Sequence, residues 1–218
     1  YALVYLDLAF IGPTAPPTAT PTNSPTCSSS GEIMGGNGAT PPFICQCSPC
    51  QITSSVYFEV YSCVDNVDCN ITCNGTDATE VCKYDQLMGP ANGHFLVKFD
   101  GDNSGLTSSA LIHAETSTSL TIECSKGSLP GHRTEVYLPP SGDFDLLCDN
   151  PTLQDPSGTA NGECNGMKIH DLDRAGGGDV YMQCGHLTKG VSDAHACAHL
   201  QYFASSSSLG ARNSVKST

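Results

Sequence analysis

Apolar and polar positions alternate along residues 1–12, YALVYLDLAFIG. One face of this pattern is wholly apolar and consists of Ala2, Val4, Leu6, Leu8 and Phe10. The opposite face is interrupted by one charge, at Asp7. A period of two with branched and aromatic side chains is typical of a β-strand, and the pair Gly12 and Pro13 ends it. The pattern predicts a strand over residues 1–12.

A spacer of different composition follows this strand over residues 13–30. Ten of the fourteen positions in PTAPPTATPTNSPT, residues 13–26, are Pro or Thr, so the segment builds no core. Such a segment favours polyproline II geometry and rises about 3.1 Å per residue, so residues 13–30 could span roughly 55 Å. Its threonines suit O-glycosylation, and the candidate positions are Thr14, Thr18, Thr20 and Thr22.

Short strand-like runs recur through the rest of the chain. Turn-forming residues separate them, and they cover residues 54–63, 94–99, 109–114, 119–124, 134–139, 143–148 and 179–184. Regularly spaced short strands favour a mainly β fold, here a β-sandwich or barrel-like body. Residues 191–204 have a helical pattern, so we expect at most one short helix, followed by a polar tail. No internal repeat with a clean period is evident.

Cysteine content adds disulfides to this fold class. The chain has 218 residues and 13 cysteines, eight of which fall between Cys27 and Cys82. An oxidising compartment converts them into cross-links, so we expect a secreted or cell-surface protein. Because 13 is odd, at least one thiol is free, bound to a metal or paired with another chain. No apolar run approaches the roughly 20 residues that cross a bilayer, so no membrane insertion is expected.

Composition also suggests domain boundaries. We expect a detached strand at 1–12, a linker at 13–30, a Cys-rich β segment at 31–89 and a β-rich body with a polar tail at 90–218. Alternatively, residues 31–218 form one domain.

The formal net charge of the chain is −13. This charge argues against nucleic acid as a partner and against an anionic membrane surface, because both need basic side chains.

Two N-glycosylation sequons lie in the Cys-rich segment. Asn70-Ile71-Thr72 and Asn74-Gly75-Thr76 both match the pattern, beside Cys69 and Cys73. We therefore expect covalent glycans at Asn70 and Asn74.

Oxygen-rich stretches suggest a possible cation. Asp100, Asp102 and Ser104 alternate around a glycine turn, as calcium ligands do, but Leu111 stands where an EF-hand-like loop has its bidentate Glu. A plain hairpin turn is the alternative, and the same ambiguity applies to Asp171, Asp173 and Asp179. No cofactor is required by any of these patterns.

Other metal and catalytic patterns are weak. His195 and His199 would share a helix face, but Ala196 stands where a metalloprotease has Glu. In this context the CxC and CxxC at Cys45, Cys47 and Cys50 favour disulfides over zinc. Nucleophile elbows and phosphate-binding loops are absent, so we do not expect an enzyme. A secreted glycoside hydrolase would need carboxylates such as Glu59, Glu115 and Glu123 to converge.

The order of the parts suggests a function. A detached apolar strand before a long spacer suits a subunit that lends the strand to a neighbour, and head-to-tail donation propagates as a helical fibril. Two alternatives are that residues 1–12 fold onto their own sheet or that they are disordered.

In this respect the strand YALVYLDLAFIG with its Pro/Thr spacer resembles the donor-strand arrangement of pilus-type fibre subunits. The Pro/Thr tract, the sequons and the dense cysteines are similar to algal or protist cell-surface glycoproteins that build extracellular fibrils. The resemblance to pilins ends at residue 27, because pilins carry few cysteines. It implies a homopolymeric structural protein and transfers no catalytic residue to this sequence. The competing interpretation is a monomeric carbohydrate-binding or adhesion module.

Overall fold

A computed structural model describes the body of the chain. The described residues are 32–34, 43–46, 49–54, 58–75, 81–101, 110–125, 134–148, 164, 166–171, 177–184, 197, 200–204 and 214–217. They contain fifteen strands and no helix. Accordingly, this part of the chain has no helical segment long and apolar enough to cross a membrane.

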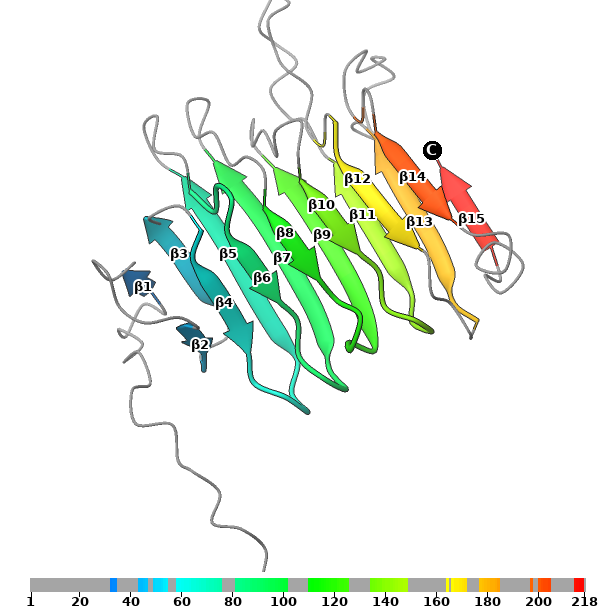
Figure 1. Cartoon of the computed structure of the whole chain (residues 1–218). Helices are drawn as coiled ribbons and strands as arrows, with labels where there is room; N and C mark the ends of the chain where they lie inside the picture. The colour runs from blue at the N-terminus through cyan, green and yellow to red at the C-terminus, as the bar shows by residue number, and fades with distance from the viewer. Residues whose placement is uncertain are drawn as a thin grey trace, which may run out of the picture.

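The strands form two sheets (Figure 1). Eight described strands make the first, in the order β1 (Glu32–Met34), β3 (Cys50–Ser54), β5 (Cys69–Gly75), β7 (His94–Gly101), β9 (Ser119–Ser125), β11 (Phe144–Cys148), β13 (Asp179–Cys184) and β15 (Ser214–Ser217). Seven described strands make the second, in the order β2 (Phe43–Cys45), β4 (Val60–Cys63), β6 (Gln86–Met88), β8 (Leu111–His113), β10 (Glu135–Tyr137), β12 (Lys168–Asp171) and β14 (Gln201–Ala204).

Consecutive strands alternate between the two sheets, and neighbours within a sheet are parallel. The chain therefore winds as a β-solenoid, in which one coil is a strand of the first sheet followed by the next strand of the second. In the middle of the solenoid successive coils are offset by about 25 residues: the His94 amide donates to Asp68, 26 residues earlier, and the His94 ring contacts Ser119, 25 residues later. Toward the ends the offset changes, from 18 residues between Phe43 and Tyr61 to 36 between Phe144 and Val180. In such a stack each coil contacts mainly its two neighbours.

The core lies between the sheets, and period-two alternation supplies it. The buried side chains stand in columns along the solenoid; in the second sheet one such column contains Phe43, Tyr61, Leu87, Ile112, Val136 and Ile169. The first sheet contributes the facing column Ile71, Val97, Ile122 and Leu146. Alternate residues of each strand face outward, as the pleat requires.

Among the described residues, five disulfides lie at the corners of the coils. Two join the end of a second-sheet strand to the start of the next first-sheet strand: Cys45–Cys50 and Cys63–Cys69. Three join a first-sheet strand to the turn before the next second-sheet strand: Cys73–Cys82, Cys148–Cys164 and Cys184–Cys197. The remaining described cysteine, Cys124, is buried with its Sγ 2.9 Å from that of Cys164.

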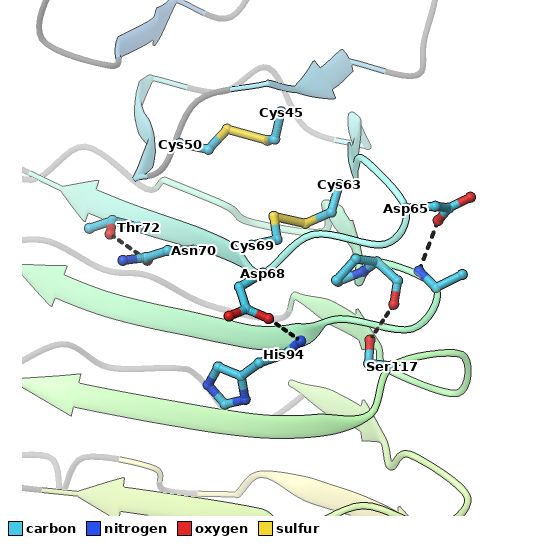
Figure 2. Close-up of a disulfide and its surroundings, with 12 residues drawn as sticks. Cys45, Cys50, Cys63, Asp65, Asp68, Cys69, Asn70, Thr72, His94 and Ser117 are labelled. Carbon is cyan, nitrogen blue, oxygen red and sulfur yellow. Dashed lines mark hydrogen bonds between the residues drawn. A yellow bond between two sulfur atoms is a disulfide. The ribbon is translucent and has the colours of Figure 1, made fainter.

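Aspartates at the corners tie neighbouring coils together (Figure 2). The carboxylate of Asp65 accepts a hydrogen bond from the Ala91 amide at 2.8 Å, and that of Asp68 accepts one from the His94 amide at 2.9 Å. The Ser117 hydroxyl donates to the Pro90 carbonyl at 3.0 Å. These bonds fix the spacing between coils where the ladder of strand hydrogen bonds ends.

The structure confirms a mainly β, disulfide-rich body built from two sheets. Strands predicted over 94–99, 109–114, 119–124, 134–139, 143–148 and 179–184 correspond to β7, β8, β9, β10, β11 and β13. Only β4 corresponds to the strand predicted over 54–63, because Phe58 occupies a bend with φ of 70°. The detached strand 1–12 and the spacer 13–30 lie outside the described residues. Both sheets continue across the predicted boundary at residue 89.

One expectation was wrong in part. The helical pattern over 191–204 ends in β14, Gln201–Ala204, because Tyr202 continues the inward column and pairs with Ile169, while most of 191–199 lies outside the described residues. Within the polar tail, Ser214–Ser217 form β15 beside β13. The coils are a structural repeat without a constant sequence period, since Leu146 pairs with Ile122, 24 residues earlier, and with Met182, 36 residues later.

Candidate functional site

The two ends of the solenoid differ in how well the core is covered. At the end where the chain enters, Phe43, Cys45 and Ile52 are at most 9% exposed. At the other end, four partly buried hydrophobic residues pack against the core: Met182, Cys197, Leu200 and Tyr202. All four belong to the last full coil, β13 to β14. The apolar core is therefore incompletely covered at its C-terminal end.

Strand β14 forms the edge of the second sheet at this end, among the described strands. The Gln201 amide donates to the Met167 carbonyl at 2.9 Å, toward the preceding coil. Because successive backbone groups of a strand point to opposite sides, the amides of Tyr202 and Ala204 face away from β12. Such an edge is a template for pairing with another strand.

A column of stacked rings on the outer face of the second sheet leads to this edge. The rings belong to His113, Tyr137, His170 and Phe203, with centroids 4.9, 4.7 and 5.2 Å apart. They stack because the strands are parallel and in register, so equivalent side chains lie above one another. Phe203, at the end of the column, is 42% exposed.

Charges beside the rings hold this outer face together. Glu135 accepts hydrogen bonds from the Lys168 ammonium at 3.1 Å and the Tyr137 hydroxyl at 3.2 Å, and it lies 3.5 Å from His170 Nε2. Burial acts to raise the pKa of Glu135, but these partners, Lys168 foremost, lower it overall. Burial and the neighbouring Glu135 carboxylate raise the pKa of Tyr137.

The side chain of Tyr202 is held in place by a hydrogen bond to a buried carboxylate, that of Asp171. Its hydroxyl donates to Oδ2 of Asp171, and burial, followed by that carboxylate, raises the pKa of Tyr202. Asp171 is 2% exposed, so this carboxylate, a candidate cation ligand from sequence, contacts the Tyr202 hydroxyl in the core. Asp179 lies in the other sheet, where its amide donates to Asp143; Asp173 lies outside the described residues.

The structure shows where both sequon asparagines lie. Asn70 and Asn74 belong to β5, half-buried, with alternating residues directed outward. The Thr72 hydroxyl lies 3.4 Å from the Asn70 side-chain oxygen (Figure 2). Glycosylation there stays a prediction, and so does O-glycosylation of Thr14, Thr18, Thr20 and Thr22, which lie outside the described residues.

The predicted calcium ligands are described only in part. Asp100 lies in β7, paired with Asn74 and Ser125, whereas Asp102 and Ser104 lie outside the described residues. In the described part of the chain, one group of three side chains is close enough to hold a metal: Cys124, Cys148 and Cys164. Because Cys148 and Cys164 form a disulfide, this group is a buried sulfur cluster and not a formed ion site. His195, His199 and Cys47 are not described.

The carboxylates considered for hydrolysis lie apart and have separate partners. Glu59, just before β4, accepts a hydrogen bond from the Tyr61 hydroxyl at 2.5 Å. Glu115 follows β8 and lies 3.0 Å from His113, while Glu123 in the other sheet lies 3.6 Å from Lys98. The structure does not bring these three carboxylates into one site.

Sequence reasoning missed β14 and its ring column, although the adjacent aromatic residues Tyr202 and Phe203, which favour strands, were a usable signal. No family model, curated protein or solved structure matches this chain.

Proposed function

We propose that this chain is the structural protomer of a secreted glycoprotein fibril, and that copies join head to tail through residues 1–12. The observation that supports this function best is the unequal covering of the core, which is closed at β2 and β3 and partly open at β14. A solenoid with one closed and one open end suits addition of further strands in one direction only.

The energetics of strand addition favour a durable contact. An added strand gains main-chain hydrogen bonds along its length and buries its alternate side chains. Full burial of Ala2, Val4, Leu6, Leu8 and Phe10 would contribute on the order of 10 kcal/mol before ordering costs. Because donor and acceptor are different surfaces, the contact does not close on itself and propagates as a filament.

Extracellular assembly agrees with the covalent chemistry. Five disulfides among the described residues require an oxidising compartment. A fibril outside the cell also gains from cross-links within each protomer, since no chaperone or reductant maintains it there. Glycans at Asn70 and Asn74 would then coat the outer face of the first sheet.

The test compares full-length variants by sedimentation and negative-stain microscopy under non-reducing conditions. Wild type should form filaments above a critical concentration. Leu6→Lys, which places a charge on the apolar face, should stay monomeric, whereas the matched control Asp7→Lys on the opposite face should polymerise. Wild type that remains monomeric at every concentration, or Leu6→Lys that polymerises normally, would contradict strand donation.

A second candidate function, carbohydrate binding, is favoured by one exposed ring pair. Phe58 is 74% exposed and stacks on Tyr84, with ring centroids 5.4 Å apart. Both residues have positive φ, 70° and 60°, which costs a non-glycine residue roughly 1–2 kcal/mol. An exposed aromatic face held at such a cost suits the apolar face of a sugar ring.

Carbohydrate binding can be measured by retention on insoluble polysaccharides. Phe58→Ala should lower retention at least tenfold, while Phe203→Ala, far along the solenoid, should retain it. Equal retention by wild type and Phe58→Ala would rule out this ring pair as a sugar platform.

A further inference from the structure

Beyond the last full coil, β13 to β14, the described solenoid continues in the first sheet only. Strands alternate between the sheets from β1 to β15, so β13 is followed by β14 in the second sheet and then by β15 in the first. β15 pairs with β13 and extends the first sheet beyond the last full coil. The matching position in the second sheet, beside β14, is occupied by no described strand (Figure 1).

The edge beside β14 has the features of an acceptor. The amides of Tyr202 and Ala204 point toward it, as the Gln201 to Met167 hydrogen bond implies. Tyr202 and Leu200 are only partly buried, whereas the equivalent inward residues of earlier coils, such as Val136 and Ile169, are fully buried. A strand with one apolar face would therefore both pair with this edge and complete the core.

Residues 1–12 match these requirements in pattern and length. Their apolar face repeats every second residue, as the inward columns do, and twelve residues exceed the four of β14. The strand precedes a spacer that can extend roughly 55 Å. β1 and β14 lie at opposite ends of the solenoid (Figure 1), so donation between copies joins the entry end of one to the exit end of the next.

We propose that the outer edge of β14, opposite β15, is the acceptor, and that it binds residues 1–12 of a second copy as a parallel strand. This inference rests on the proposed function and assigns its acceptor surface. The donor strand pairs with the Tyr202 and Ala204 backbone, covers Tyr202 and Leu200 with its apolar face, and lies beside Phe203.

An acceptor variant and its control test the edge. Ala204→Pro removes one outward amide in a strand that tolerates proline at an edge, whereas Ala204→Ser keeps that amide. Ala204→Pro should abolish polymerisation and Ala204→Ser should retain it, with circular dichroism showing that both are folded. Filaments formed equally well by Ala204→Pro would overturn the acceptor assignment while leaving donation by residues 1–12 intact.

Mixing two defective variants separates donation between copies from insertion within one chain. Leu6→Lys has a damaged donor and an intact edge, and Ala204→Pro has the reverse. Each alone should sediment as a 22.8 kDa monomer, and the mixture should give a 1:1 dimer. A mixture that stays monomeric would overturn donation between copies. Polymerisation of Leu6→Lys alone would instead overturn the proposed function itself.

A cross-linking measurement does not depend on how well Ala204→Pro folds. Phe203→p-benzoylphenylalanine places a photoreactive group at an exposed site beside the edge. In a mixture of light and ¹⁵N-labelled copies, cross-links to residues 1–12 should join light to heavy chains. If light chains are cross-linked only to light residues 1–12 and heavy chains only to heavy ones, the edge binds the strand of its own chain and the proposal is overturned. Filaments that contain no cross-link between Phe203→p-benzoylphenylalanine and residues 1–12 would also overturn it.

Discussion

At the scale of single residues, the corners of the coils depend on backbone conformations that few residues adopt readily. Phe58, Tyr84 and Gly166 each lie two residues before a second-sheet strand, and their φ values are 70°, 60° and 71°. Glycine adopts this conformation without steric cost, whereas the two aromatic residues do not. The same corner is thus built by different residue types in different coils.

A second feature at this scale is the polar cluster around Glu135, and it predicts a dependence of stability on pH. Because folding lowers the pKa of Glu135, its contribution is present above the ordinary pKa and is lost as pH falls through the lowered value. Glu135→Gln should therefore lower the free energy of unfolding more at pH 7 than at pH 3. Urea unfolding at the two pH values measures this.

Glu123→Gln serves as the matched control, because Glu123 pairs with Lys98 at a longer 3.6 Å and both side chains are 36% exposed. Its effect at pH 7 should be smaller, as expected for an exposed ion pair. Equal losses for Glu135→Gln at pH 7 and pH 3 would contradict the electrostatic role assigned to Glu135.

At the scale of elements, the sequence predicted seven of the fifteen described strands but not their arrangement. Period two identifies a strand such as Phe144–Cys148 because one face is buried, and that holds in parallel and antiparallel sheets alike. Parallel stacking is set by partners in other coils, such as Val180 for Phe144, and loops of unequal length hide that register. Short runs such as Lys168–Asp171 and Ser214–Ser217 carry too little pattern to stand out.

Cysteine spacing held the overlooked signal for the repeat. Cys82, Cys164 and Cys197 each lie four residues before a second-sheet strand, with φ of 57°, 54° and 56°. The bond from Cys184 fixes Cys197 in this corner, four residues before β14. For the candidate site, the apolar face of residues 1–12 was readable from sequence, whereas the open edge of β14 emerges only from the order of strands.

The last disulfide should control the stability of the exit coil. Cys184→Ala combined with Cys197→Ala opens a loop of 13 residues and should cost about 2–4 kcal/mol. Hydrogen exchange should show lost protection in β14, while β7 and β9 remain protected, because each coil contacts mainly its neighbours.

Cys45→Ala with Cys50→Ala provides the comparison, since this loop of 5 residues lies at the opposite end. It should leave exchange in β14 unchanged. Uniform loss of protection along the whole solenoid in either variant would contradict this independence of the coils.

At the scale of the whole molecule, charge opposes association of copies. Each chain carries a formal net charge of −13, so approaching protomers repel one another. Salt screens this repulsion over about 10 Å at 0.1 M, while the apolar contact of the donated strand is not weakened. Polymerisation followed by light scattering should therefore accelerate from 10 mM to 300 mM NaCl. Slower assembly at high salt would indicate that attractive charges drive the contact.

The disulfides have a mechanical consequence for a fibre built in this way. All five disulfides among the described residues bridge positions between 5 and 16 apart, so they close small loops. Cys45–Cys50 and Cys63–Cys69 do join one coil to the next, but only at the corner where the chain already passes between them. Tension along the axis would be borne by hydrogen bonds and packing between coils, which can yield one coil at a time. The loop closed by a disulfide cannot be stretched out, so each coil that unfolds under tension releases a shorter length of chain. A fibre of these protomers would lengthen in small increments under load and recoil when the coils stack again.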